Sequence, residues 1–344
     1  MARKVLVTGA AGFIGFFVMS ALARRGEDVI GVDNINDYYD VRLKYGRLGE
    51  CGFPDRAAVD SGAMLESSRY PGCRFRKLDV TDKERLDALF AEAHFDAVVH
   101  LAAQPGVRYS ISHPYAYLLN NVTGFLNILE ACRQEHVAHL VYASSSSVYG
   151  LHAQPLCRED DRTDSPVSLY AATKKSNELM AYSYAKLYGM AVSGLRFFTV
   201  YGPWGRPDMS PMLFASAIRK GEPIRVFNHG DMSRDFTYID DIVGGLVRVL
   251  DRQPGPDADG VRARICNIGS SRPVRLLDFI AELERAMGGT APKTFLPMQP
   301  GDVYATWADT GRLEKETGYK PCVSLQDGLR AFAGWYCSAQ NPLV

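Results

Sequence analysis

The sequence predicts an α/β fold in which a doubly wound parallel sheet is followed by a second, smaller mixed α/β domain. Between residues 4 and 202, short apolar runs rich in Val alternate with stretches of helical length. The runs end in Gly or in small or polar residues, which is typical of buried parallel strands. The alternation loosens at residues 201–210, where Pro and Gly cluster and shorter elements begin.

The expected strands and helices follow one another in a regular order. The run 4–9 has the pattern of a buried strand, and 13–26 has the length of a helix and ends in two Arg and a Gly, a stop signal. Further strands are expected at 28–33, 73–82, 95–103, 139–150 and 191–202, and further helices at 83–93, 120–136 and 169–189. This order implies a parallel sheet covered by helices on both faces.

The chain is expected to form two interleaved domains. The first covers residues 1–198 and the second covers residues 199–344. Residues 234–250 have the pattern of a strand and a helix that return to the first domain, so we expect a returning segment near 235–268. A surface loop is expected at 251–260, which is rich in Pro, Gly and Asp.

Length, composition and charge bound the class of protein. The 344 residues are 47% hydrophobic and 23% charged, which is ordinary for a globular chain with a sizeable core. Lys+Arg and Asp+Glu are both 39, and this balance argues against a partner that is a nucleic acid or an anionic membrane. No apolar run approaches the length of a membrane span.

Cysteine usage indicates a reducing compartment. Seven Cys are scattered along the chain without a CxxC pair, which favours free thiols over a disulfide framework or a zinc site. The first strand begins almost at Met1, which leaves no room for a signal peptide. We therefore expect a cytoplasmic protein without a metal site.

The stretch TGAAGFIG, residues 8–15, places Gly9, Gly12 and Gly15 between the first strand and the first helix. Without side chains there, the backbone can approach a pyrophosphate, and the helix N-terminus offers free N–H groups and a positive dipole end. Asp33 ends the second strand, where it can accept hydrogen bonds from a ribose 2′-OH and repel a 2′-phosphate. The alternative is a tight turn without a ligand. We predict a Rossmann-type domain that binds NAD rather than NADP.

Other strand ends supply further cofactor contacts. Asp79 can accept a hydrogen bond from the adenine amino group, with Val80 against the ring; an N-cap of the next helix is the alternative role, which Thr81 or Asp82 could also fill. The small residues of HLAAQ, 100–104, leave space for the cofactor. The expected cofactor contacts also include Phe13, Ile14, Asn34, Leu101, Ala102 and Ala103.

A serine run and a Tyr/Lys pair are candidates for catalysis. Ser144 to Ser147 are poor strand formers at a strand end, where ligands of open α/β sheets bind, although a polar cap of the next loop is the alternative. Tyr170 and Lys174 lie one helical turn apart, and beside an NAD site Lys174 and a cationic nicotinamide would lower the phenol's pKa. Tyr170 could then take a proton from a sugar hydroxyl while hydride leaves the same carbon.

These motifs resemble the extended short-chain dehydrogenase/reductase family, and within it the nucleotide-sugar epimerases. The segments 33–48, 195–214 and 226–242 are similar to UDP-glucuronic acid 4-epimerases in particular, and the resemblance covers nearly the whole chain. It implies tightly bound NAD⁺, a transient 4-keto sugar that rotates, and return of hydride to its other face. By the resemblance, Ser145, Tyr170 and Lys174 are catalytic, and Asn120 lies near the active site and the cofactor.

Two departures from related enzymes narrow the substrate. Family dehydratases have an Asp-Glu pair at the serine strand, whereas this chain has serines, so dehydration is not expected. UDP-galactose epimerases have Asn in a Tyr-Phe-Asn triplet, where this chain has Thr199 after two Phe. Hydroxyls at Ser145, Ser146, Ser147 and Thr199 suit a C6 carboxylate better than a CH₂OH group.

The UDP diphosphate requires cations or helix N-termini. By the resemblance, Arg206 and Arg234 match diphosphate-contacting positions, and Arg pairs well with two phosphate oxygens. Arg108 is a weaker candidate, in a loop over the sugar. Asp302 is a candidate for a ribose hydroxyl, with a turn residue after Gly301 as the alternative. A solvated surface Arg is the alternative for each arginine.

The resulting hypothesis is a UDP-glucuronate 4-epimerase, an isomerase that uses NAD and passes through a 4-keto intermediate without decarboxylation. The alternatives are a UDP-glucuronate decarboxylase, a UDP-glucose/galactose-type 4-epimerase, and a catalytically silent NAD-binding regulator. The helices 120–134 and 169–189 are apolar on more than one side, which indicates a second partner for them. The resemblance implies a homodimer in which these two helices and their copies form a four-helix bundle.

Overall fold

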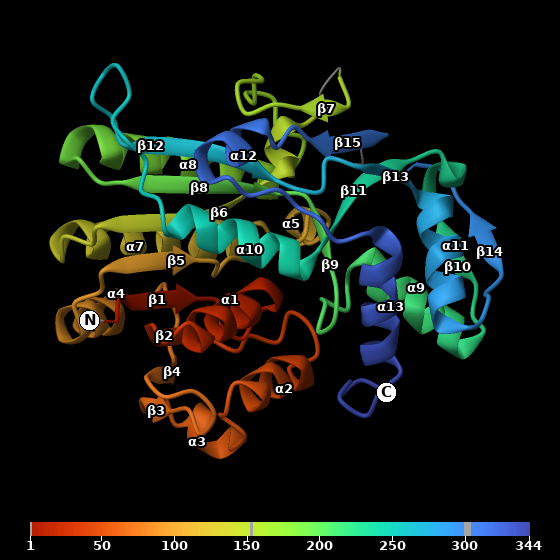
Figure 1. The fold of residues 1–344 in the computed structure, drawn as a ribbon, viewed down its shortest axis with the longest axis horizontal. Coiled ribbons are helices and arrows are strands. Elements are labelled where there is room, and N and C mark those ends of the chain that lie inside the picture. The colour runs from red at the N-terminus through yellow and green to blue at the C-terminus, as the bar shows by residue number, and fades with distance from the viewer. Residues whose placement is uncertain (1, 152–153, 299–303) are drawn as a thin grey trace.

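The computed structural model describes residues 2–151, 154–298 and 304–344. Its largest element is an eight-stranded sheet, parallel except for the pairing of β3 with β4 (Figure 1). In spatial order its strands are β12 (Ala263–Ile268), β8 (Val192–Phe197), β6 (His139–Ser145), β5 (Ala97–His100), β1 (Lys4–Thr8), β2 (Asp28–Asp33), β4 (Cys73–Lys77) and β3 (Leu65–Glu66). The doubly wound parallel sheet predicted from the alternating pattern is confirmed.

Helices cover both faces of this sheet because its strands are apolar on both sides. Along β1, Val5 and Val7 join one buried cluster, while Leu6 joins another on the opposite face. Against the first face pack α1 (Phe13–Arg24) and α10 (Ile239–Leu250), which lie in front of the sheet in Figure 1. Against the second pack α4 (Lys83–Ala93), α7 (Gly124–Gln134) and α8 (Leu169–Tyr188).

Smaller sheets form beside the carboxyl ends of the large one. One contains β13 (Pro273–Arg275), β11 (Ser233–Tyr238), β15 (Ala305–Ala308), β7 (Leu156–Cys157) and β9 (Thr199–Tyr201), and the other contains β10 (Ile224–Val226) and β14 (Lys293–Phe295). Their helices, on the right in Figure 1, are α9 (Ser210–Lys220), α11 (Leu276–Met287) and α13 (Leu325–Tyr336); α12 (Gly311–Thr317) packs on β12. This part is mixed α/β, as predicted.

The predicted return of residues 234–250 to the large sheet is correct for the helix and wrong for the strand. Helix α10 packs on α1, but β11 pairs with β9, β13 and β15 in the smaller sheet. The strand that returns is β12, which pairs with β8 at the edge of the large sheet. Sequence pattern identifies a strand but not its partners, since those are set by long-range contacts.

Several short elements had no counterpart in the prediction. They include α2 (Arg42–Glu50), α3 (Arg56–Asp60), α5 (Tyr109–Ser112), α6 (Pro114–Tyr117) and the 3₁₀ turn η3 (Phe227–Gly230). The π-helical turn η1 (Leu118–Thr123) overlaps the start of the helix expected at 120–136, and the 3₁₀ turn η2 (Ser146–Tyr149) replaces the end of the strand expected at 139–150. The strand expected at 191–202 is divided at Phe198 into β8 and β9, which belong to different sheets. In the described parts of the chain, no helix combines the length and the apolar character needed to cross a membrane.

Candidate active site

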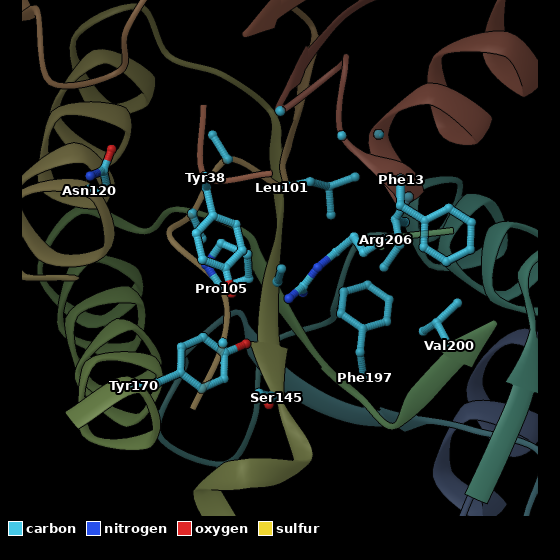
Figure 2. A pocket seen from close by; sticks show the side chains of 18 of the residues that line it. Phe13, Tyr38, Leu101, Pro105, Asn120, Ser145, Tyr170, Phe197, Val200 and Arg206 are labelled. Carbon is cyan, nitrogen blue, oxygen red and sulfur yellow. The ribbon is translucent and has the colours of Figure 1, made fainter. Parts of the chain in front are cut away.

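The carboxyl ends of β1, β2, β5, β6 and β8 surround a cavity of about 350 Å³. Ligands of open α/β sheets bind at such an edge. We call the region around Gly9, Gly12, Gly15, Asp33 and Lys44 the glycine end of the cavity. The region around Ser145, Tyr170, Lys174, Thr199 and Arg206 is the tyrosine end, most of which Figure 2 shows.

The glycine end requires residues without side chains. A Cβ atom on Gly15 would lie 2.0 Å from the Gly9 carbonyl oxygen, and one on Gly9 would lie 2.8 Å from the backbone nitrogen of Ala102. Gly9 also has a φ of +69°, which an L side chain rarely adopts. Helix α1 then begins at Phe13 without a capping side chain or an acidic residue in its first turn. This backbone cradle fits the pyrophosphate of a dinucleotide such as NAD.

Two backbone N–H groups hold the Asp33 carboxylate in an orientation that suits a ribose hydroxyl. This carboxylate accepts hydrogen bonds from the backbone N–H groups of Ala11 (3.2 Å) and Ile35 (2.8 Å). The Lys44 ammonium lies 3.5 Å away and donates to the Asn36 side-chain oxygen at 2.8 Å. Sequence reasoning missed Lys44, which lies eleven residues after Asp33 on α2, a helix that was not predicted.

Asp79 lies beside the cavity rather than in its wall. Leu78 and Val80 line the cavity, whereas the Asp79 carboxylate accepts hydrogen bonds from the Asn34 amide at 2.9 Å and the Thr81 hydroxyl at 2.7 Å. Asp79 is not the N-cap of α4, because Asp82 accepts the hydrogen bond from the Arg85 N–H. The bonds to Asn34 and Thr81 oppose the effect of burial and hold the pKa of Asp79 below its ordinary value.

The Tyr/Lys pair lies on the first two turns of α8. Ser168 caps this helix by accepting from the Ala171 N–H at 3.1 Å. Lys174 is 3% exposed, and its ammonium donates to the Ala143 carbonyl at 2.9 Å, which ties the helix to β6. Burial lowers the pKa of Lys174 to about 8. Nearby, burial and the Lys174 charge lower the pKa of His100 to about 3, so His100 is neutral at pH 7.

Tyr170 is placed as predicted, but the groups that set its pKa differ from the prediction. Burial raises the pKa of Tyr170 above its ordinary value, while the Ser145 hydroxyl and the Arg206 charge lower it. Arg206 is thus a cation that favours the phenolate of Tyr170. Figure 2 shows the Tyr170 hydroxyl beside the strand end that bears Ser145, with the Arg206 guanidinium pointing into the same space.

The serine run ends β6 and continues into the turn η2. Ser144, Ser145, Ser146, Ser147 and Thr199 line the cavity. The Ser144 hydroxyl also donates to the buried Glu178 carboxylate at 2.6 Å. Glu178 also forms a two-pronged ion pair with Arg196 at 2.8 and 2.9 Å, which joins α8 to β8 behind the site.

Of the predicted site residues that the structure describes, most meet at this cavity and three do not. Asp79 lies beside it, as described above. Arg108 lies with its guanidinium over the Phe227 ring at 5.4 Å, and Arg234 donates to the backbone oxygens of Ser233 and Tyr304 at 2.9 and 3.2 Å. Asp302 lies outside the described residues. The predicted residues that line the cavity are Gly9, Gly12, Phe13, Ile14, Gly15, Asp33, Asn34, Val80, Leu101, Ala102, Ala103, Asn120, Ser145, Ser146, Ser147, Tyr170, Lys174, Thr199 and Arg206.

Sequence reasoning also missed several lining residues and one supporting residue. Asn121, next to Asn120, exchanges hydrogen bonds with the Gln104 backbone at 2.7 and 3.1 Å and donates to the Thr173 hydroxyl at 3.1 Å. It thereby fixes the loop after β5 to the helix of Tyr170. The lining residues that had not been identified include Asn36, Tyr38, Tyr39, Lys44, Pro105, Gly106, Val107, Phe197, Phe198, Val200 and Met209.

Comparison with known proteins places these features in a family. Residues 5–269 match the NAD dependent epimerase/dehydratase family. An uncharacterized 37.6 kDa protein in the cld 5′ region of Escherichia coli O111:H- is 49% identical, over 97% of this chain and 98% of that protein. UDP-glucuronate 4-epimerase 4 of Arabidopsis thaliana is 46% identical, over 97% of this chain and 75% of its own length.

A solved structure is similar over nearly the whole chain. The crystal structure of UDP-glucuronic acid 4-epimerase from Bacillus cereus, in complex with UDP-glucuronic acid and NAD, superposes with a TM-score of 0.84. The two sequences are 33% identical over 97% of this chain and 98% of that chain. The resemblance inferred from the motifs is thus confirmed, and the protein belongs to the NAD dependent epimerase/dehydratase family, part of the extended short-chain dehydrogenases/reductases.

Proposed function

We propose that this chain is an NAD-dependent UDP-glucuronate 4-epimerase, an isomerase that converts UDP-glucuronic acid into UDP-galacturonic acid. Relatives of this activity match over nearly the whole chain, and the B. cereus enzyme was crystallised with the sugar nucleotide and NAD. The observation that carries the proposal is that Ser145, Tyr170 and Lys174 share one cavity with the glycine turn and with the hydroxyls of Ser146, Ser147 and Thr199.

The tyrosine end supplies proton transfer. The Tyr170 phenolate accepts a proton from the C4 hydroxyl of the sugar, with Ser145 sharing that proton, and the resulting phenol later returns it. NAD, when bound, supplies the hydride acceptor and donor that make oxidation and reduction at C4 possible. Lys174 is held by its bond to the Ala143 carbonyl, and it would hold the nicotinamide ribose of bound NAD.

The hydroxyl groups of the tyrosine end would prevent the 4-keto intermediate from losing CO₂. Oxidation of glucuronate at C4 gives a β-keto acid, which loses CO₂ when the carboxylate bond aligns with the carbonyl π system. Neutral donors at Ser145, Ser146, Ser147 and Thr199 keep the carboxylate hydrogen-bonded and fix its orientation, whereas desolvation alone would promote the loss. This distinction separates an epimerase from a decarboxylase.

The test is incubation of the purified protein with UDP-glucuronate, followed by chromatography and mass spectrometry of the products. We expect UDP-galacturonate of unchanged mass. Loss of CO₂ would replace the proposal with a decarboxylase. The product is then UDP-pentose if the hydride returns to the sugar, or UDP-4-keto-pentose if it stays on NADH. Turnover of UDP-glucose at a similar kcat/KM would indicate a neutral-sugar epimerase, and an inert protein that retains NAD would indicate a silent binding function.

We further propose that the protein is a cytoplasmic homodimer built on α7 and α8. Leu126 on α7 is 39% exposed, and Leu179 and Tyr182 on the adjoining α8 are 58% and 47% exposed. Exposed apolar side chains on two packed helices favour a four-helix bundle with a second copy. All seven cysteines are free thiols, which supports the reducing compartment. Residues 1–198 would hold NAD and residues 199–344 most of the nucleotide sugar.

The dimer predicts a specific effect of charge on this surface. Leu179→Arg should convert the dimer into a monomer, since an arginine buried at a helix interface would lack a partner. Leu187→Arg is the matched control on the same helix, since Leu187 is 70% exposed and lies near its C-terminal end. Light scattering at micromolar protein measures both, and a monomeric wild type would contradict the proposal.

A further inference from the structure

The Arg206 guanidinium, in the tyrosine end, is held by a carboxylate two residues further along the chain. Its Nε and Nη2 atoms donate to the two oxygens of Asp208 at 3.1 and 2.5 Å. This two-pronged arrangement fixes the plane of the guanidinium as well as its position. Within the described residues, Nη1 makes no hydrogen bond, so one edge of the guanidinium remains for a ligand.

Tyr38 completes the arrangement by contacting both Asp208 and Arg206. Its hydroxyl donates to the Asp208 carboxylate at 3.0 Å, and the Arg206 guanidinium lies 5.9 Å from the centre of its ring. The ring meets Tyr109 edge-on at 4.9 Å, and a Cβ atom on Gly106 would lie 2.5 Å from the Tyr38 hydroxyl. Tyr38 follows β2, whereas Arg206 and Asp208 follow β9, so the three residues join segments far apart in the sequence.

The protonation states of Tyr38, Asp208 and Arg206 determine which of them donates each hydrogen bond. Burial and the Asp208 charge raise the pKa of Tyr38 to about 12, so Tyr38 keeps its proton and donates it. Burial disfavours the charged forms of Asp208 and Arg206, but the charge and hydrogen bonds of each residue stabilise the charged form of the other. The pKa of Asp208 is therefore lowered and the pKa of Arg206 is raised. Asp208 therefore remains a carboxylate and Arg206 a cation throughout the neutral range.

We propose that Asp208 and Tyr38 are positioning residues of the reaction, which hold the Arg206 guanidinium so that its remaining edge meets an anionic oxygen of the UDP-sugar. Neither residue needs to touch the substrate, because both act through Arg206. The proposal rests on the proposed function for the identity of the sugar nucleotide. The anionic oxygen belongs either to the diphosphate or to the sugar carboxylate, and the two sources are distinguishable by experiment.

The test is a double-mutant cycle with Asp208→Asn and Arg206→Met. For UDP-glucuronate, Asp208→Asn should lower both kcat/KM and binding affinity by about 10- to 100-fold, the usual scale for hydrogen bonds to a charged group. In the Arg206→Met background the same change should cost less than about twofold, because the group that Asp208 holds is gone. Tyr38→Phe should show the same pattern with a smaller loss. Equal losses in both backgrounds would overturn the proposal.

Binding of UDP and of UDP-glucuronate, measured by calorimetry on the NAD-loaded protein, keeps the test independent of turnover. Weaker binding of both ligands assigns the Arg206 edge to the diphosphate, and weaker binding of UDP-glucuronate alone assigns it to the carboxylate. Unchanged binding of both would contradict the proposal. A wild-type protein that binds UDP-glucuronate but does not epimerise it would refute the proposed function. The double-mutant cycle could then still be evaluated from the binding affinities.

The chain offers a matched control for the loss of an Arg–Asp pair. Arg162 and Asp164 have the same spacing, with a 2.7 Å contact between Arg162 Nε and Asp164, but both side chains are largely exposed. Asp164→Asn should change neither kcat/KM nor affinity. Melting temperature and bound NAD are recorded for all variants. If Asp208→Asn unfolds the protein, the cycle of Tyr38→Phe with Arg206→Met decides, since it removes one hydroxyl and no charge.

Discussion

The glycine end of the cavity is formed mainly by backbone atoms, whereas the tyrosine end is formed by side chains. At the glycine end, backbone atoms of one short segment form the surface, and the absence of Cβ atoms at Gly9 and Gly15 is what shapes it. At the tyrosine end, side chains from α8, β6, β9 and the segment after β2 converge, and hydrogen bonds hold them. The shape of the glycine end therefore depends on the absence of Cβ atoms, and the chemistry of the tyrosine end depends on where its side chains are held.

This difference teaches which changes each end tolerates. A backbone cradle fails in an all-or-none manner, because an added methyl group collides with a main-chain oxygen that cannot move away. A set of convergent side chains fails by degrees, because each one contributes a separate bond or charge. The predictions below test this contrast, beginning with the largest expected effect.

The first prediction concerns Gly15→Ala in the glycine end. Its Cβ would lie 2.0 Å from the Gly9 carbonyl oxygen, so the turn must shift and the pyrophosphate cradle is lost. We expect purified protein without bound NAD, measured by chromatography of the nucleotide released on denaturation. Gly49→Ala is the control, since Gly49 has open space around it. Retention of NAD by Gly15→Ala at the wild-type level would contradict the role given to the turn.

The second prediction concerns Tyr170→Phe in the tyrosine end. Loss of the phenol oxygen removes the group that exchanges a proton with the C4 hydroxyl, so kcat should fall by at least about 100-fold, the scale of acid–base assistance. Bound NAD should remain, because the glycine end is unchanged. Tyr188→Phe, at the exposed end of the same helix, serves as the control and should retain full activity. An active Tyr170→Phe enzyme would remove Tyr170 from the mechanism.

The same contrast explains what could be predicted from sequence. The glycine turn is a contiguous motif whose geometry is local, so it was identified together with Asp33. Tyr170 and Lys174 were found because helical spacing puts them on one face. Lys44, Tyr38 and Asp208 were missed, since their roles depend on how α2 and the segment after β2 pack across the cavity. Arg108 and Arg234 do not line the cavity, and their predicted contacts with the ligand stay predictions.

The third prediction concerns Thr199→Val, which removes one hydroxyl and keeps the shape of the side chain. If Thr199 donates to the sugar carboxylate, KM for UDP-glucuronate should rise by about 10- to 100-fold, as for loss of a hydrogen bond to a charged group. The less restrained 4-keto intermediate should also lose more CO₂. Mass spectrometry should therefore show a higher ratio of UDP-pentose or 4-keto-pentose to UDP-galacturonate. An unchanged ratio with an unchanged KM would show that Thr199 does not hold the carboxylate.

The last prediction concerns pH and is the smallest in size. Tyr170 accepts a proton only as the phenolate, so activity falls as pH decreases and the phenolate becomes protonated. Burial raises the pKa of Tyr170, and the Arg206 charge opposes that increase. Arg206→Met removes the opposing charge while keeping most of the volume, so the pKa of Tyr170 should rise further.

The acidic limb of the kcat profile should therefore move to higher pH in Arg206→Met, by up to about one unit, at the low end of the range for a nearby charge. The position of the limb, and not the height of the profile, is the measured quantity, so a general loss of substrate binding does not imitate the effect. Arg162→Met is the control, because Arg162 pairs with Asp164 and is largely exposed. An acidic limb that stays at the same pH would mean that Arg206 acts on the substrate alone. Ser145 and the bound cofactor would then be the groups that lower the pKa of Tyr170.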